Sequence, residues 1–168
     1  LKKAWRHAVF VKGAQPFIVL YDELVAPAPA TFQFMLHGLA PFTIDAATAR
    51  LQLAQPKAGL EVRYLSPVPL TFKQTDGFVP APSREYPNHW HVEAGTTEKR
   101  AAVGVATVLM PHRAGAKPTW AARRVDDATG SAIEVTVDGK THTIRFPAPG
   151  AETLAPLPGR RAGRGAHR

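Results

Sequence analysis

The sequence feature that most constrains the fold is a spacing of two between large apolar residues. In residues 31–37 every second residue is Phe or Leu, and residues 60–64 alternate apolar and charged side chains in the same way. Successive side chains of a β-strand point to opposite faces of a sheet, so this spacing predicts strands with one buried face. The 13 Gly and 16 Pro fall in short segments between such runs, as turns do. We therefore predict an all-β fold, an antiparallel β-sandwich of stacked sheets with few or no helices.

One apolar run is almost unbroken and predicts a strand in the middle of a sheet. Residues 101–110 contain no charged side chain, and their β-branched residues favour a strand over a buried helix. Prolines should end strands because they cannot donate to a ladder. Pro111 is therefore expected to end this run, and Pro27 and Pro29 to end the run at residues 17–25. Further strands are predicted at residues 6–12, 31–37, 51–53, 60–64, 70–72 and 89–94.

Residues 131–146 predict a β-hairpin. Asp138-Gly139 supplies the positive φ angles that a type I′ turn requires, and alternating residues flank it on both sides. Placing these two residues at the tip fixes the register, and the fixed register puts the apolar residues of both strands on one face. The predicted register pairs Val137 with Lys140, Val135 with His142 and Ile133 with Ile144.

Composition and charge distribution narrow the choice of partners. The formal net charge is +8, but residues 1–12 carry four basic side chains and no acid, and residues 158–168 carry four arginines. A domain that binds nucleic acid usually carries its basic surplus on the folded body, so we expect no nucleic acid partner. No apolar run approaches the length of a membrane span, so we expect no membrane partner. We predict one β-sandwich domain over residues 1–146 and a largely disordered Pro/Gly/Arg-rich tail over residues 147–168.

No standard catalytic motif is present. The chain has no cysteine, which excludes disulfides and thiolate chemistry, and it has no nucleophile elbow, phosphate loop or dinucleotide fingerprint. We therefore assign no catalytic residue and expect no cofactor. The first residue is Leu1, and no apolar stretch typical of a signal peptide follows the early basic residues. We expect the chain to be a piece of a longer protein.

The spacing His89-x-His91-x-Glu93 is the best candidate for a metal site. On one strand these three side chains would share a face, and His37 or His112 would be available as a further ligand. A solvated polar face opposite buried residues explains the same spacing more simply. We therefore assign no metal, and a small metal-dependent hydrolase built on these residues stays an alternative.

Three further residues are singled out by their surroundings. Asp22 interrupts an apolar strand, so we expect a structural carboxylate bound to backbone amides or to an arginine such as Arg6. Tyr86 lies in the proline-rich loop at residues 76–88 and is expected at the surface, where its ring can stack on a sugar. His37 ends its strand before a glycine and is a candidate for contact with substrate.

Several of these segments resemble heparinase II/III-type polysaccharide lyases. The resemblance covers about residues 5–146 and includes residues 6–12, 17–24, 31–37 and 107–113. Its other motifs are Lys73-Gln74-Thr75-Asp76-Gly77-Phe78 and Asn88-His89-Trp90-His91-Val92. The resemblance implies a periplasmic or secreted enzyme that cleaves uronate-containing polysaccharide by β-elimination.

In that family the catalytic histidine and tyrosine lie in an N-terminal helical toroid, so the resemblance transfers no catalytic residue and no metal ligand to this chain. It implies a C-terminal β-sandwich that braces the catalytic domain and lines the substrate cleft. The expected partners are an acidic polysaccharide and the missing N-terminal catalytic domain of the same protein. The candidate substrate-binding residues are His37, Tyr86, His89 and His91. A stand-alone carbohydrate-binding or structural β module is the alternative.

Overall fold

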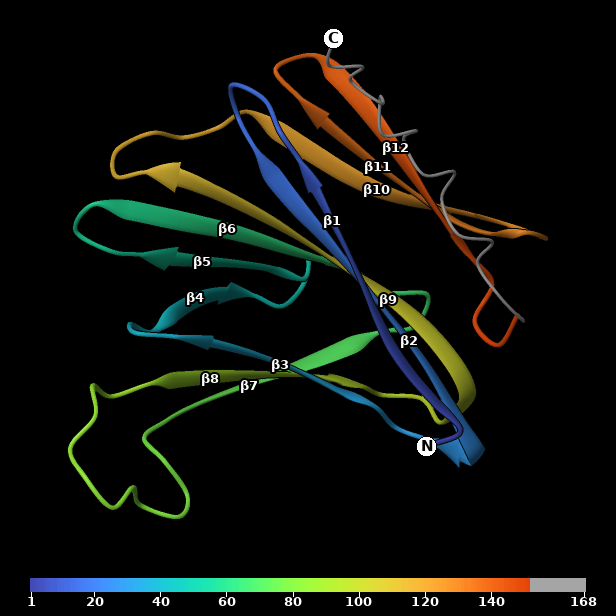
Figure 1. Cartoon of the computed structure of the whole chain (residues 1–168), viewed down its shortest axis with the longest axis horizontal. Coiled ribbons are helices and arrows are strands. Elements are labelled where there is room, and N and C mark those ends of the chain that lie inside the picture. Colours follow the sequence, from blue (N-terminus) through green and yellow to red (C-terminus); the bar gives the residue numbers. More distant parts are fainter. Residues whose placement is uncertain (152–168) are drawn as a thin grey trace, which may run out of the picture.

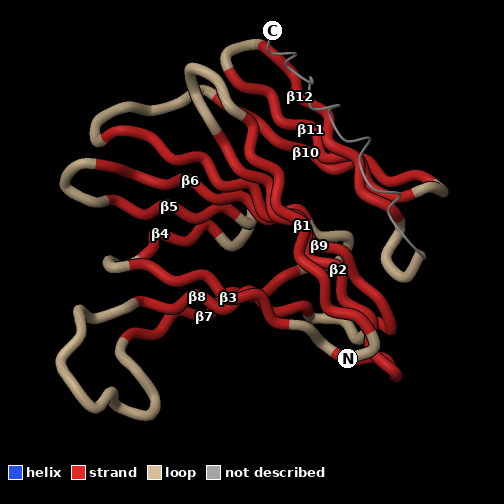
Figure 2. Tube along the Cα trace, in the orientation of Figure 1, coloured by secondary structure: helices blue, strands red, loops and turns tan. Residues whose placement is uncertain are grey.

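The structure is a computed structural model that describes residues 1–151, and this part of the chain contains strands and turns only (Figure 2). Within it, no helix is long and apolar enough to cross a membrane. The strands are β1 (Lys3–Val11), β2 (Phe17–Ala30), β3 (Gln33–Gly38), β4 (Phe42–Asp45), β5 (Arg50–Ala54), β6 (Ala58–Leu65), β7 (Leu70–Asp76), β8 (Trp90–Thr96), β9 (Arg100–Arg113), β10 (Trp120–Asp127), β11 (Gly130–Val137) and β12 (Lys140–Pro147). The predicted all-β fold is confirmed.

The strands form three antiparallel sheets (Figure 1). A central sheet has the order β1-β2-β9-β6-β5-β4, and the two smaller sheets have the orders β10-β11-β12 and β3-β8-β7. One apolar cluster joins the central sheet to the β10-β11-β12 sheet, and a second joins it to the β3-β8-β7 sheet. Alternation along the central strands assigns the two clusters to opposite faces, so the predicted stacking of sheets is confirmed.

Strand β9 shows how one sequence serves both clusters. Val103 and Val105 belong to the cluster under the β3-β8-β7 sheet, whereas Ala106, Val108 and Met110 belong to the cluster under the β10-β11-β12 sheet. The strand lies between β2 and β6, so it has no free edge. Burial on both faces explains why residues 101–110 are apolar almost throughout, and the predicted central position is confirmed.

The prolines do not end their strands as predicted. Strand β2 continues through Pro27 and Pro29 to Ala30, and β9 continues past Pro111 to Arg113. The pairing of β2 with β9 is irregular between Val25 and Ala30, so both prolines of β2 lie where no regular ladder is formed. Beyond Leu109, β9 pairs with β6 alone, so the missing N–H of Pro111 interrupts no ladder with β2.

The hairpin at the C-terminal end of the domain has the predicted register. Val137 pairs with Lys140 and Ile133 with Ile144. Asp138 and Gly139 have φ angles of 48° and 79°, as a type I′ turn requires. This turn aligns Ile133, Val135, Val137 and Phe146 so that all four enter the core.

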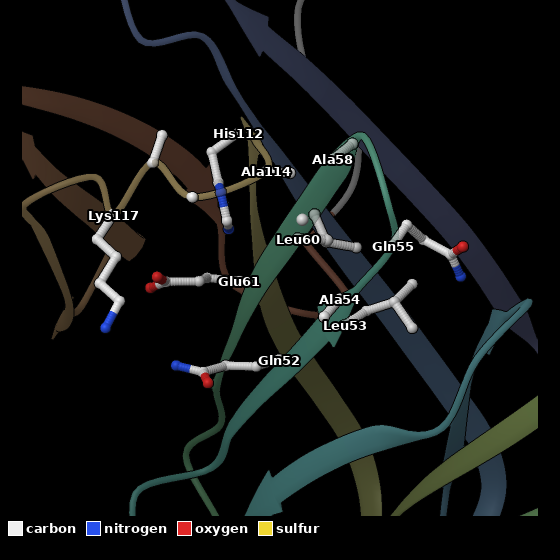
Figure 3. Close-up of a pocket in the computed structure, with 13 residues that line it drawn as sticks. Gln52, Leu53, Ala54, Gln55, Ala58, Leu60, Glu61, His112, Ala114 and Lys117 are labelled. Atoms are coloured by element: carbon white, nitrogen blue, oxygen red, sulfur yellow. The ribbon is translucent and has the colours of Figure 1, made fainter.

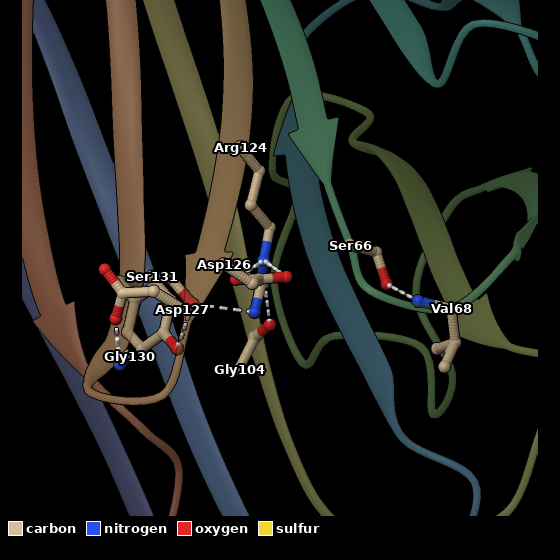
Figure 4. Close-up of polar contacts among 9 residues, drawn as sticks. Ser66, Val68, Gly104, Arg124, Asp126, Asp127, Gly130 and Ser131 are labelled. Carbon is tan, nitrogen blue, oxygen red and sulfur yellow. Dashed lines mark hydrogen bonds and ion pairs between the residues drawn. The ribbon is translucent and has the colours of Figure 1, made fainter.

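A polar contact fixes the β10-β11-β12 sheet on the central sheet (Figure 4). The guanidinium of Arg124 donates to the carbonyl oxygen of Gly104 on β9 and, at 2.8 Å, to the hydroxyl of Ser131 on β11.

The buried ring of Tyr21 stacks on Phe146 with 4.3 Å between ring centroids. A side chain at Gly104 would place its Cβ closer than 3.0 Å to the Tyr21 hydroxyl, so this position needs glycine.

The segment predicted as a largely disordered tail, residues 147–168, begins within the described residues. Pro147 is the last residue of β12, and Gly150 and Ala151 contact Glu23 on β2 and Lys3 on β1. The amide of Gly150 donates to the buried carboxylate of Glu23 at 2.7 Å, and the amide of Ala148 donates to the Thr129 carbonyl at 3.2 Å. A buried acceptor thus helps to order a segment that consists of Ala, Pro and Gly. The rest of the predicted tail, residues 152–168, lies outside the described residues.

Candidate functional site

The outer face of the β3-β8-β7 sheet carries His37 and His91. Phe34, Val92 and Ala94 point inward and are buried in the core, so the alternate residues of the same strands point away from the central sheet. The register places His37 on β3 directly opposite His91 on β8. Two of the predicted site residues, separated widely in sequence, are thus neighbours on one open face.

A short set of contacts fixes His91 at this position. Its ring meets the His37 ring edge to face, with 4.5 Å between centroids and 81° between planes. Its Nε2 donates to the carbonyl oxygen of Gly77 at 2.6 Å, and the amide of Gly77 donates to the carbonyl oxygen of His89 at 3.0 Å. These bonds close the base of the loop between β7 and β8. His91 is therefore held by the backbone, whereas the ring of His37 is exposed.

Phe78 brings the other two predicted residues to the same place. Its ring centroid lies 5.2 Å from that of His89, 6.0 Å from that of His91 and 6.5 Å from that of Tyr86. Phe78 and Tyr86 are 37% and 56% exposed, so their rings offer apolar surface to solvent beside imidazole donors and acceptors. The four predicted residues and Phe78 form what we call the histidine–aromatic cluster. Phe78 was not predicted, although it is a rare large apolar residue in a polar, proline-rich loop.

The predicted row of His89, His91 and Glu93 on one strand is wrong in one member. Strand β8 begins at Trp90, so His89 belongs to the loop and not to the alternating face. The carboxylate of Glu93 accepts a hydrogen bond from the amide of Gln33 at 2.8 Å. Among residues 1–151, no group of three or more histidines, aspartates and glutamates is arranged to hold a metal ion.

Asp22 lies on β2 and forms the expected pair with Arg6 on β1. The guanidinium donates from Nε to one carboxylate oxygen at 2.6 Å and from Nη2 to the other at 2.9 Å. Asp22 is almost fully buried, and the bidentate pair satisfies both of its oxygens. Burial and the negative charge of Asp22 raise the pKa of Tyr64 to about 12, so this tyrosine stays protonated at neutral pH.

A concave feature lies on the central sheet (Figure 3). It is a pocket of about 310 Å³ between strands β5 and β6 and the segment at residues 114–117. The side chains of Gln52, Glu61, His112 and Lys117 lie around one space in Figure 3. Glu61 is fixed there because its carboxylate accepts from the indole N–H of Trp120 at 2.6 Å.

The sequence did not predict this pocket. Of its polar residues only His112 had been singled out, and then as a metal ligand. The His112 ring lies so close to the β6 backbone that a Cβ at Gly59 would overlap it. The alternation along β5 and β6 places Gln52 and Glu61 on one face, which is the only signal for the pocket in the sequence.

Comparison with known proteins gives solved structures only. No protein-family model matches the chain, and no curated protein matches it. A heparinase III gene product superimposes with a TM-score of 0.62 and 17% sequence identity over 78% of this chain. A second heparinase III crystal structure gives 0.60 and 16% over 84%, and the heparan sulfate lyase HepC from Pedobacter heparinus gives 0.60 and 12% over 90%.

The shared region is a small part of those proteins. The chain covers 22%, 27% and 29% of the three structures, respectively. At these identities the likeness establishes a common fold. The resemblance to heparinase II/III-type lyases, first suggested by short segments, is confirmed at that level. The chain is a β domain with the fold of a region in heparinase III and heparan sulfate lyase structures.

Proposed function

We propose that the chain is the C-terminal β-sandwich part of a heparinase II/III-like lyase that cleaves uronate-containing polysaccharide by β-elimination. The observation that carries this proposal is the fold shared over 78–90% of the chain with structures of which the chain spans less than a third. Its role is to brace the N-terminal catalytic domain and to line the substrate cleft. Its ligand is an acidic polysaccharide, and its location is the periplasm or the cell exterior.

A partly exposed apolar strip supports the bracing role. Phe10 on β1 is 56% exposed and pairs with Ile18 on β2, which in turn pairs with Leu109 on β9. Cross-strand partners share a face, so the three side chains form one apolar strip across the central sheet. An apolar surface of this kind commonly marks contact with another domain. The occupant that the proposal assigns to it is the catalytic domain of the same protein.

The histidine–aromatic cluster supports the cleft-lining role. It combines exposed aromatic rings with imidazoles on a rigid sheet, which suits contact with both the apolar faces and the hydroxyl groups of sugar rings. His91 bonds to the backbone of the loop, so it positions the cluster, and His37 and Tyr86 reach solvent. The proposal gives these residues a binding role and no part in proton transfer.

Two measurements on the 168-residue chain test this function. Binding to heparin, alginate and chondroitin is measured by calorimetry, with neutral dextran as the control, and ultraviolet absorbance reports unsaturated product. We expect binding to at least one acidic polysaccharide, no binding to dextran and no product. Product formed by the chain alone would show that catalytic residues lie within it. Equal binding to dextran would contradict an acidic ligand.

Substitutions in the cluster test the binding surface. Tyr86→Ala and His37→Ala each remove an exposed ring and are expected to weaken binding about three- to tenfold, as the loss of one polar or stacking contact does. Thr143→Ala on the exposed face of β12 is the matched control and should bind as the unmodified chain does. Unchanged affinity in both cluster variants would place the binding surface elsewhere.

A further inference from the structure

One face of the central sheet is only partly covered. The apolar cluster beneath the β10-β11-β12 sheet draws on β2, β9 and Leu65 of β6, and within residues 1–151 it takes nothing from β4 or β5. Four residues on this face of β5 and β6 are polar: Arg50, Gln52, Glu61 and Arg63. The register places Gln52 opposite Glu61 and, one step along the same two strands, Arg50 opposite Arg63.

The two arginines form an unfavourable arrangement on their own. Side chains directly opposite on antiparallel strands lie close together, and like charges at such positions are destabilising. The Nε atom of Arg63 is buried and has no hydrogen-bond partner. The ion pairs of the described residues involve neither Arg50 nor Arg63. Burial and the charge of Arg50 together lower the pKa of Arg63.

The acidic residue paired with Arg50 in the ladder is already engaged. Asp45 on β4 pairs with Arg50 in the ladder, but its carboxylate accepts hydrogen bonds from the hydroxyl and the amide of Thr48 in the adjoining turn. The Asp45 carboxylate therefore forms no ion pair with Arg50 or Arg63. Two guanidinium groups on neighbouring strands, neither of them in an ion pair within residues 1–151, match the geometry that binds a carboxylate or sulfate group.

The pocket described above adjoins the arginines. Gln52 and Glu61 are the next cross-strand pair on this face, about 7 Å along the strands. They line the pocket together with Lys117 and His112. An amide, a carboxylate, an ammonium and an imidazole around one space offer donors and acceptors for hydroxyl groups (Figure 3). The two arginines and the pocket together therefore suit a sugar ring that carries an acidic group better than they suit a free ion.

We propose that the open face of β5 and β6 binds an acidic saccharide, with its carboxylate or sulfate group between Arg50 and Arg63 and its ring in the adjoining pocket. Binding places a negative charge between two positive ones and gives the guanidinium N–H groups of both arginines an acceptor. The site lies on the opposite side of the central sheet from the histidine–aromatic cluster. It adds a second contact for the acidic polysaccharide of the proposed function and rests on that function only for the identity of the polymer.

NMR spectroscopy of the arginine Nε–H groups tests the site directly. The intact chain is titrated with a uronate-containing disaccharide, with the neutral disaccharide maltose and with inorganic sulfate, all at constant ionic strength. We expect saturable shifts of the Arg50 and Arg63 Nε–H signals and of the Gln52 side-chain amide with the uronate disaccharide. Maltose should cause none of these shifts. Shifts with inorganic sulfate but none with the uronate disaccharide, or shifts of all arginines alike, would overturn the proposal.

Three variants separate the site from general charge effects. Arg50→Gln, at an exposed position, and Arg63→Lys, which keeps the charge but loses the Nε–H, should each weaken binding of the uronate disaccharide about tenfold or more. Arg123→Gln removes an exposed arginine paired with Glu134 on the β10-β11-β12 sheet and should have no effect. Equal losses in all three would overturn the proposal. Loss of polysaccharide binding in Tyr86→Ala but not in Arg50→Gln would refute this site and leave the proposed function intact.

Discussion

Two buried charges on the same face of the central sheet have opposite surroundings. The carboxylate of Glu23 on β2 accepts from the ammonium of Lys3 and from the amide of Gly150, both at 2.7 Å, and His7 lies 3.7 Å from its second oxygen. Arg63 on β6 faces the like charge of Arg50 and has a buried N–H without a partner. The covered half of the sheet thus uses its charge to hold chain segments together, and the open half leaves its charge available to a ligand.

The difference follows from what covers each half. Over β1 and β2 the chain supplies its own partners, because residues 148–151 return to the sheet and β1 supplies a lysine. Over β5 and β6 the described part of the chain supplies less cover: Trp120 of β10 and residues 114–117 lie beside Glu61, whereas Arg50 and Gln52 are exposed. Burial of a charge is unfavourable without a partner, so a half-buried arginine without one is a feature that a stability argument alone does not explain.

The largest loss of stability is expected from removing Glu23, the charge with more partners. Glu23→Ala deprives Lys3 and Gly150 of their common acceptor in a nearly fully buried position. Breaking a buried pair typically costs about 3–5 kcal/mol, and the partial exposure of Lys3 places the expected loss at about 2–4 kcal/mol. Urea unfolding measures it. The control is Glu134→Ala, whose pair with Arg123 is exposed and should contribute less than about 1 kcal/mol.

A pair of glycine substitutions compares the packing of the two halves. Gly104→Ala in the covered half would press against Tyr21, which is buried and stacked on Phe146, so we expect a loss of about 1–3 kcal/mol. Gly59→Ala in the open half would press against the His112 ring, which is half-exposed and can swing toward solvent. Its cost should be clearly smaller. Equal losses in thermal unfolding would show that the open half is packed as rigidly as the covered half.

The stabilisation from Glu23 should depend on pH. Burial would raise the pKa of this carboxyl, but hydrogen bonds from Lys3 and Gly150 outweigh burial and hold the pKa below its ordinary value of 4.5. In the unfolded chain the group takes up a proton near pH 4.5, whereas the folded chain resists protonation to lower pH. Its contribution is therefore complete above about pH 4.5 and is lost as the pH falls through the lowered pKa.

Urea unfolding between pH 7 and pH 3 checks this expectation, with Glu23→Gln as the reference. Exposed carboxylates such as Asp45 and Asp127 also have a lowered pKa, but they are present in both proteins and cancel in the difference. The difference in stability between the two proteins should shrink below pH 4.5. A difference that stays constant across the range would mean that Glu23 does not carry this charge-dependent stabilisation.

Much of the fold was readable from short-range patterns, because a strand with one buried face repeats every two residues. The hairpin and β9 followed directly from the Asp138-Gly139 turn and from an apolar run. Strand β4 was missed because four residues are too few to show alternation. Strand β10 was missed because its exposed face carries Arg123, and neighbouring charges obscure the apolar positions.

The sites depend on register between distant strands, which no local pattern encodes. Alternation predicts that His37 and His91 each point outward, but only the pairing of β3 with β8 puts one ring against the other. The same holds for Arg50 and Arg63, which appear in the sequence as ordinary surface charges. Their unfavourable pairing became visible only in the folded sheet.

The smallest expected effect is a gain in stability. Arg50→Gln removes one of the two like charges at an exposed position, so the folded chain should become more stable by a few tenths of a kcal/mol. Differential scanning calorimetry would detect it as a slightly higher Tm. With a saturating uronate disaccharide the order should reverse, because the ligand stabilises the chain that binds it more tightly by a larger amount. A variant that is less stable than the unmodified chain without ligand would mean that Arg50 serves packing, and the contrast between the two halves of the sheet would then disappear.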